Sequence, residues 1–158
     1  MEIKEVTNDI HLKLAKDLFN LTWDLIEKSE RTAEDDEKMI YAANASRFHW
    51  GYVGTSLNFA RGEWQISRVY ALLKRSEPAL YHAKKSLELC LINELGELDL
   101  GFAYEAMARA ATVQGDQRAQ EKYLELAEEV ASKMTEIENQ SWLLKNIKTV
   151  KTNTIPTW

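Results

Sequence analysis

The sequence contains few of the residues that interrupt helices or cross-link chains. Its 158 residues include only two prolines, six glycines and one cysteine. Proline breaks helices and glycine weakens them, so their scarcity leaves room for long helices. A single cysteine excludes a disulfide within the chain, and runs of alternating Val, Ile and Thr, which would predict strands, are also few. These absences favour an all-α fold.

Acidic residues outnumber basic ones, 25 Asp and Glu against 20 Lys and Arg. The net charge of −5 argues against a general binder of nucleic-acid backbones, because such proteins concentrate Lys and Arg on one surface. No stretch approaches the ~18 apolar residues of a membrane-spanning helix. The charged N-terminal stretch MEIKEVTNDIHLK lacks the apolar core of a signal peptide. We therefore expect a cytoplasmic protein that has neither nucleic acid nor a membrane as its partner.

The size and composition are those of one globular domain. With 158 residues, of which 45% are hydrophobic and 28% charged, the chain is long enough to bury a continuous core. Residues 1–158 are therefore expected to form a single helical domain. Cys90 falls on the apolar stripe of a predicted helix, which indicates a buried and unreactive thiol.

The stretch from Arg61 to Leu91 predicts two helices folded back on each other. Apolar and small residues recur at steps of three and four on both sides of Ser76, which places them on one face of each helix. Ser76 suits an N-cap, and Pro78 falls in the first turn, where its missing N–H costs little. A connection this short between two amphipathic helices makes them antiparallel neighbours.

The same periodicity predicts about seven helices along the whole chain. Besides the two helices of the hairpin, which follow Thr55 and Ser76, the expected helices cover residues 8–29, 34–52, 99–114, 117–135 and 139–150. Residues suited to helix ends are Asn8 or Asp9, Thr32 with Asp35, Thr55, Gly115 and Asp116. The tail 151–158 is expected to be irregular, because Pro156 stops any helix near it.

An internal self-match predicts that helical hairpins are stacked. When the chain is shifted by 40 residues, Trp64 aligns with Tyr104, and the turn at 75–76 aligns with the turn at 115–116. A period near this length is typical of proteins built from repeated helix pairs. In such proteins each pair covers the apolar face that its neighbour exposes.

Within residues 56–135 the chain resembles tetratricopeptide-repeat (TPR) proteins. The stretch GFAYEAMARAATVQGDQRAQEKYLELAEEVA follows the order of small and large residues of that family. The matching positions are Tyr104, Met107-Ala108, Ala111, Gly115-Asp116 and Ala127. The chain departs from the family in its longer period, and it lacks the tyrosine late in the first helix. It is also similar to uncharacterised bacterial proteins of this shape, a resemblance that brings no activity with it.

The TPR resemblance implies a superhelix of antiparallel α-hairpins and a role in protein interaction. We therefore interpret the chain as a non-catalytic, TPR-like module that binds another protein or a peptide in grooves between its helices. The alternative is a small-ligand sensor or an enzyme, whose polar pocket would contain Arg47, His49, Arg68 and Arg109. An open, aromatic-lined groove would favour the first interpretation, and a deep pocket with converging polar groups would favour the second.

Polar and aromatic residues gather on the second to fifth predicted helices, and two interpretations of them are open. In the first they are structural: Glu105 and Arg109 pair one turn apart, and the tryptophans fill the core. In the second they line a concave surface, where arginines would hold a carboxylate or phosphate through paired hydrogen bonds. The residues assigned to this ligand- or partner-binding surface are Asn44, Arg47, His49, Trp50, Gln65, Arg68, Glu105 and Arg109.

The sequence offers little for metal or catalytic chemistry. His11, His49 and His82 are not three or four residues apart, and no Cys/His group occurs, so neither a metal site nor a cofactor is expected. No Gly-rich phosphate loop or nucleophile elbow is present. His49 or His82 with Glu63 or Glu105 would be the acid/base pair of an enzyme, but spacing alone does not bring them into contact. No residue is therefore assigned a catalytic role.

Self-association is also predicted. The tryptophans of the first helix, the last helix and the tail exceed the apolar surface that a thin stack of helices covers readily. These residues are Trp23, Trp142 and Trp158. We therefore expect a homodimer.

Overall fold

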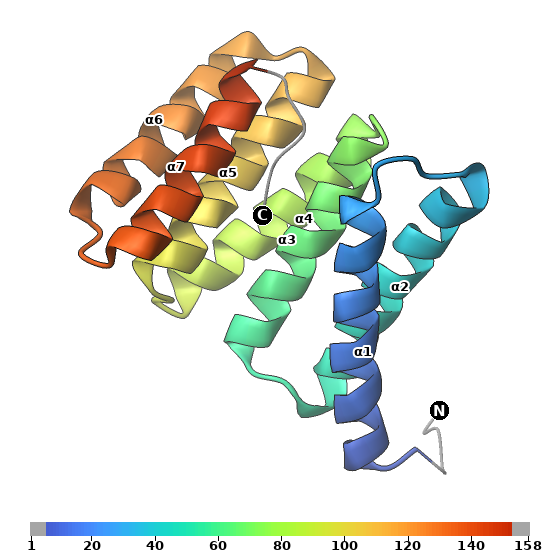
Figure 1. Cartoon of the computed structure of the whole chain (residues 1–158). Helices are drawn as coiled ribbons and strands as arrows, with labels where there is room; N and C mark the ends of the chain where they lie inside the picture. The colour runs from blue at the N-terminus through green and yellow to red at the C-terminus, as the bar shows by residue number, and fades with distance from the viewer. Residues whose placement is uncertain (1–5, 153–158) are drawn as a thin grey trace.

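The computed structural model describes residues 6–152, and within that range it contains seven α-helices and no strand (Figure 1). The helices are α1 (Asn8–Glu27), α2 (Ala33–Val53), α3 (Ser56–Leu72), α4 (Ser76–Ile92), α5 (Glu97–Gln114), α6 (Gln117–Lys133) and α7 (Ile137–Thr152). The predicted all-α fold is therefore confirmed. The predicted irregular tail begins too early, because α7 extends to Thr152, and residues 153–158 lie outside the described residues.

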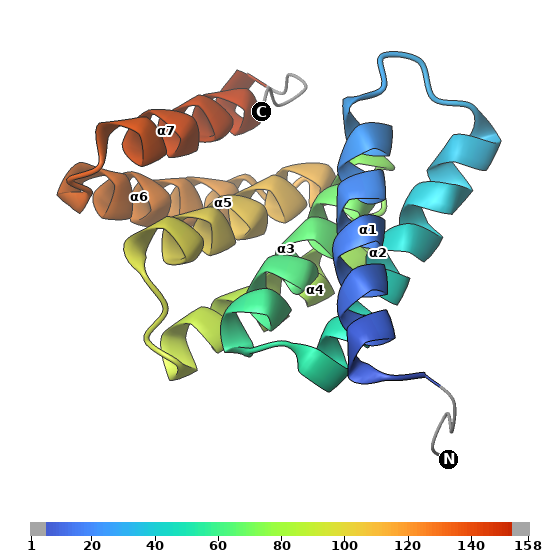
Figure 2. The same ribbon diagram turned by 60° about the horizontal axis from the view of Figure 1, so that its bottom comes forward.

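Successive helices pack as adjacent pairs, α1 with α2, α3 with α4, and α5 with α6. The pairs are joined by further contacts of α3 with α5 and of α5 with α7. In Figure 2 the helices α5, α6 and α7 run across the direction of α1 and α2, so the array turns along its length. Among residues 6–152, no helix has the length and apolar character needed to span a bilayer.

Several helix ends are formed by the residues that the sequence predicts. Thr32 and Asp35 form a capping box, in which the Asp35 N–H donates to Thr32 Oγ1 at 3.1 Å and the Thr32 N–H donates to Asp35 Oδ2 at 3.0 Å. Gly115 follows α5 with φ of 82°, a left-handed conformation that glycine adopts without strain. Asp116 then caps α6, and Thr55 is the N-cap of α3.

Two other predicted caps are displaced by one residue. Thr7 caps α1, and Asn8 and Asp9 already belong to its first turn. Arg75 occupies the N-cap position of α4 without a side-chain capping bond, whereas Ser76 is the first helical residue. At α1 the neighbouring Thr, Asn and Asp all suit the cap, so the local pattern does not decide between them, and at α4 the shift of one residue is within the usual spread of assigned helix ends.

The two hairpins repeat at 41 residues, close to the predicted period of about 40. Helices α3 and α5 begin 41 residues apart (97 − 56), and so do α4 and α6 (117 − 76). At this shift Arg68 aligns with Arg109, and the buried Trp64 aligns with the buried Glu105 instead of with Tyr104. The alignment of Trp64 with Tyr104 in the sequence is therefore one residue away from the structural register.

Small residues allow α5 to lie at the centre of the array. It contacts α3, α4, α6 and α7, and its buried residues include Gly101 and the alanines Ala103, Ala106, Ala108, Ala110 and Ala111. A Cβ atom at Gly101 would overlap Leu143 Cδ2 and would lie 3.3 Å from Val130 Cγ1. The absence of a side chain there lets α5 approach both α6 and α7.

Replacing Gly101 by alanine tests this close approach. Leu143 is fully buried and cannot swing into solvent, so we expect Gly101→Ala to lower the free energy of unfolding by roughly 1–3 kcal/mol. The matched control is Gly51→Ala in α2, whose Cβ would meet Arg47 Nη1 only at 3.9 Å. The control should be neutral or stabilising by up to about 1 kcal/mol, because alanine favours helix. Urea denaturation measures both variants, and equal effects would contradict the packing argument.

Candidate functional site

A fully buried carboxylate joins α3 to α5. Glu105 of α5 accepts a hydrogen bond from Arg68 Nη2 of α3 at 3.0 Å through Oε2. Its other oxygen, Oε1, accepts one from Arg109 Nε, one turn further along α5, at 2.7 Å. The side chains of Arg68 and Glu105 are only 1% and 0% exposed. The i,i+4 pair expected in the structural interpretation is therefore present, and Arg68 extends it to a second hairpin.

Helix α7 completes this network with polar groups that the sequence did not identify. Asn146 Oδ1 accepts from both terminal nitrogens of Arg68, at 3.3 and 3.4 Å. Arg109 Nη2 donates to the Thr149 hydroxyl at 2.7 Å and to the Asn146 carbonyl at 3.2 Å. The sequence does contain one indication of this network. Asn146 lies between the apolar Leu143 and Ile147, and a polar group on a buried face needs hydrogen-bond partners.

The charges of this network stabilise one another. Burial raises the pKa of Glu105, but the positive charges of Arg109 and Arg68 outweigh this effect and hold the pKa below its ordinary value. Burial lowers the pKa of Arg68, and the Glu105 carboxylate opposes that shift. The carboxylate is therefore ionised at neutral pH and binds two guanidinium groups. This arrangement suits a group that fixes the position of helices better than one that takes part in acid/base chemistry.

A second network surrounds Glu63 of α3. Its carboxylate accepts from Arg47 Nε of α2 at 3.0 Å and lies 2.6 Å from His82 Nδ1 of α4. The ring of Tyr70 stacks beside His82 with a centroid distance of 6.0 Å. Burial raises the pKa of Glu63, but the hydrogen bond and charge of His82 and the charge of Arg47 together bring it below its ordinary value. This is the Glu–His contact that the sequence left open, and it joins three helices of adjacent pairs.

Two histidines meet between α1 and α2. His11 Nδ1 and His49 Nδ1 are 2.8 Å apart, and the Tyr52 ring stacks on His11 at a centroid distance of 4.0 Å. A hydrogen bond at this distance needs one ring to donate its Nδ1 proton and the other to accept it. Burial, and then the neighbouring His11, lower the pKa of His49. Protonation of both rings would place two N–H groups against each other.

The remaining predicted residues lie apart from these networks. Asn44 is exposed and donates to the Ile40 carbonyl of its own helix at 2.9 Å. Trp50 is half-buried near the end of α2. Gln65 is fully buried and donates to the Phe19 carbonyl of α1 at 2.9 Å, which links α3 to α1.

The residues of the predicted concave binding surface are therefore spread over the helical array, and their role in binding stays a prediction. The structure divides its eight residues among separate places, and only Arg68, Glu105 and Arg109 are in mutual contact. Gln65, Arg68 and Glu105 are buried at helix junctions and present no open face. The reason is that first helices of successive hairpins pack directly against each other here, and polar groups between them must bond across the junction.

An aromatic-lined pocket lies where α1, α3, α5 and α7 meet, and its volume is about 440 Å³. Five of its lining residues are aromatic, namely Phe19, Trp23, Trp64, Phe102 and Trp142. Their rings form a continuous row in that order, with centroid distances of 6.1, 5.3, 5.2 and 4.6 Å. Each of the four helices contributes at least one ring, so the row crosses the whole array.

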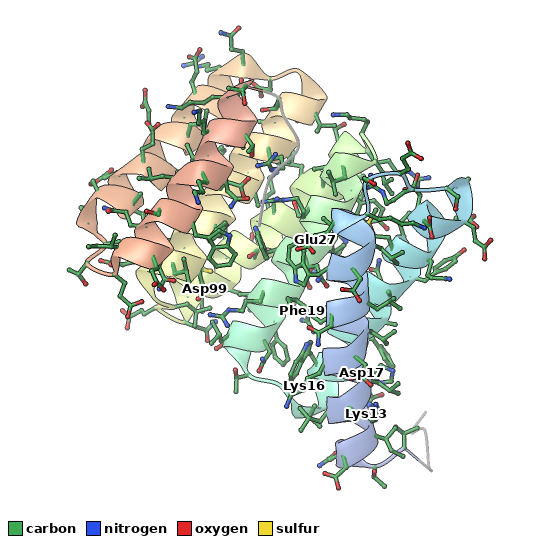
Figure 3. The ribbon with its side chains drawn as sticks, in the orientation of Figure 1. Lys13, Lys16, Asp17, Phe19, Glu27 and Asp99 are labelled. Atoms are coloured by element: carbon green, nitrogen blue, oxygen red, sulfur yellow. The ribbon has the colours of Figure 1, made fainter. Side chains whose placement is uncertain are left out.

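The pocket carries three charged groups. Arg61 donates from Nε to Asp99 Oδ1 at 2.7 Å and from Nη2 to Asp99 Oδ2 at 3.1 Å. The hydrogen bond that Arg61 donates to Asp99 raises the pKa of Arg61, and the charges of the two side chains offset each other. Glu27, the last residue of α1, is exposed and forms no ion pair with any other residue in the range 6–152. Figure 3 shows Phe19 and Glu27 along α1 and Asp99 on the other side of α3.

The sequence pattern does not predict this pocket. It places Trp64 in the core and Trp23 and Trp142 at a dimer contact. In the structure, Trp23 and Trp142 line the pocket. One local signal was available, because Phe19, Trp23 and Glu27 follow at steps of four and share one face of α1.

The described residues give no sign of a metal centre and confirm the buried thiol. Within 6–152, no three His, Cys, Asp or Glu side chains are grouped so that they could hold a metal ion. Cys90 is buried as predicted, and burial raises the pKa of its thiol to about 12. No protein-family model, curated protein or solved structure matches this chain.

The Glu105 network makes a prediction about stability. Glu105→Gln would leave two guanidinium groups without their carboxylate, and breaking a buried ion pair in this way costs roughly 3–5 kcal/mol. We therefore expect a large fall in the free energy of unfolding at neutral pH, measured by urea denaturation. The control is Glu129→Gln, which removes an exposed pair with Lys133 and should change stability by less than about 0.5 kcal/mol. Similar small changes in both variants would show that the network is not structural.

The histidine pair makes a prediction about pH. The folded pKa of His49 lies below its ordinary value of 6.5, so between these two values the unfolded chain binds more protons than the folded chain. Its contribution to stability is complete above pH 6.5 and is lost as the pH falls through the folded pKa. We expect the urea midpoint to fall between about pH 7.5 and about pH 5, and to fall less in His49→Gln. An identical pH dependence in the variant would refute this assignment.

Proposed function

We propose that the protein is a non-catalytic interaction module that binds a segment of a partner protein in the aromatic pocket. The observation that carries the proposal is the row of five rings from α1, α3, α5 and α7 around a volume of about 440 Å³. Tryptophan and phenylalanine side chains offer large, rigid contact areas at low entropic cost, and tryptophan dominates many protein interfaces. A bulky side chain of a partner would be desolvated on several sides here.

The polar groups of the pocket support binding more than catalysis. Arg61 and Asp99 satisfy each other through two hydrogen bonds, and burial raises the pKa of the neighbouring Cys90 thiol to about 12, which disfavours the nucleophilic thiolate. Ser86, which also lines the pocket, donates its hydroxyl to the Ala60 carbonyl at 2.9 Å and has no base beside it among these bonds. The TPR resemblance adds an analogy at the level of fold, and it identifies no partner.

A small ligand is the second candidate for the same pocket. The volume falls within the range of about 300–1,000 Å³ that is usual for ligand sites. The pocket expected for this function would contain Arg47, His49, Arg68 and Arg109, and none of these lines the aromatic pocket. A small-ligand function would therefore depend on the aromatic rings and not on those four residues.

Homodimer formation remains a prediction. Trp23 and Trp142 are half-buried in the pocket, and Trp158 lies outside the described residues. A more exposed aromatic face is found on α2, where Tyr41, Phe48 and Tyr52 are 68%, 51% and 50% exposed. Light scattering at micromolar concentration distinguishes the two states, and a monomeric mass would remove the prediction.

Peptide selection followed by substitution tests the interaction function. A random peptide library is selected on the wild-type protein, and the selected peptides are titrated against Phe19→Ala and Trp142→Ala. Both rings are half-buried, so we expect a folded protein that binds roughly tenfold or more weakly, as for a loss of interface anchors. The matched control is Tyr41→Ala on α2, which should leave affinity unchanged. Equal affinity for all variants, or no selectable peptide, would refute the proposal.

A further inference from the structure

The charge at the pocket indicates what kind of segment it binds. We propose that the partner segment is basic and aromatic: a bulky aromatic side chain enters the pocket, and a neighbouring Lys or Arg pairs with Glu27. This inference rests on the proposed function and adds the chemical class of the partner. It is carried by the position of one unpaired carboxylate beside five aromatic rings.

The three charged residues that line the pocket leave one negative charge unbalanced. Arg61 and Asp99 neutralise each other in a two-bond pair, so the net charge contributed by the three charged lining residues is that of Glu27. Glu27 is the last residue of α1, and the last turn of that helix contains no basic residue. The Ile26 carbonyl at the negative end of α1 already accepts from Arg31 Nη1 at 3.2 Å, so the Glu27 carboxylate is the group here that favours a cation.

The aromatic rings that line the pocket favour both a ring and a cation of the partner. Trp and Phe faces attract cations as well as other rings, so a segment that carries both groups gains from both. The face of α1 toward the pocket presents Phe19, Trp23 and Glu27 at steps of four residues, which places two rings and the carboxylate in one line. An aromatic side chain against these rings and a cation at the end of the line match this order.

The positive charges already near the pocket restrict where a second cation can bind. The Arg68 guanidinium lies over the Trp64 ring, 5.5 Å from its centroid, and repels a second cation at that ring. Lys16 is exposed on α1 but does not line the pocket, and it precedes Glu27 by 11 residues, or about 16 Å along the helix. Positive charges therefore lie at Trp64 and toward the start of α1. Lys28 and Arg31, which follow Glu27, are already paired with the α2 carboxylates of Asp35 and Asp36. The end of the pocket formed by Glu27 is the place for the cation of the partner.

Four short peptides separate the role of the ring from the role of the charge. The probes are acetylated and amidated Gly-Lys-Trp-Lys-Gly, the same peptide with Gln or with Glu in place of both lysines, and Gly-Lys-Ala-Lys-Gly. Dissociation constants are measured by NMR titration of the full chain at low salt. We expect the Lys peptide to bind roughly two- to fivefold more tightly than the Gln peptide, as for one exposed ion pair, and the Glu peptide to bind most weakly. The Ala peptide should not bind.

Substitution then locates the charge effect. In Glu27→Gln the ratio between the Lys and Gln peptides should fall to about one, while binding of the Gln peptide is unchanged. The matched control is Glu30→Gln, an exposed glutamate just after α1 that does not line the pocket, and it should keep the wild-type ratio. The titrations are repeated on Trp158→Ala, in which the peptide supplies the one tryptophan outside the described residues, and binding to either protein supports the proposal.

The outcomes distinguish the two levels of the proposal. Equal affinities for the Lys, Gln and Glu peptides, with a weaker Ala peptide, would overturn the basic class and leave the aromatic anchor in place. A charge effect that survives Glu27→Gln would assign it to another residue and overturn the role of Glu27. Equal binding of the Trp and Ala peptides, or no binding of any peptide to either protein, would overturn both the inference and the proposed function.

Discussion

The arrangement of this protein depends on a carboxylate that has no access to water. Glu105 is fully buried, and its charge is compensated by Arg68 from the preceding hairpin and Arg109 from its own helix. Both arginines also bond to α7 through Asn146 or Thr149. An unpaired charge in such a place is strongly unfavourable, so α3, α5 and α7 must keep the one relative position that satisfies all these groups. The network contributes to the uniqueness of the packing more surely than to net stability.

The pocket is a consequence of that position. Trp64, Phe102 and Trp142 lie on the same three helices that Glu105 holds together, and their rings are in contact with one another. Helix α5 can come this close to its neighbours because most of its buried side chains are alanine or glycine. The aromatic rings of these helices lie on the pocket side, and the small residues of α5 lie against its neighbouring helices. The polar junction, the small-residue packing and the aromatic row are thus three parts of one arrangement.

The distribution of charge distinguishes the two buried networks from the pocket. Buried or half-buried charges of the two networks around Glu63 and Glu105 are paired with partners from other helices. At the pocket, the Arg61–Asp99 pair is likewise satisfied, whereas Glu27 faces solvent beside aromatic rings. A paired charge holds a helix in position, whereas an exposed charge beside an apolar pocket can bind a partner. This contrast is the reason for preferring the aromatic pocket to the arginine cluster as the site.

The sequence by itself determined the elements of this protein. Apolar residues at steps of three and four, capping residues such as Thr32 and Asp116, and the turn glycine Gly115 act within a few residues, so helix number and most helix ends could be read from the chain. The exact repeat and the site could not. The 41-residue register is defined by where the helices of the folded array begin, and the contacts of Arg68 with Glu105 and Asn146 span 37 and 78 residues. Only the packed helices decided that the predicted binding arginine Arg68 is buried and that Trp23 and Trp142 wall a pocket, because burial is a property of neighbours far apart in the chain.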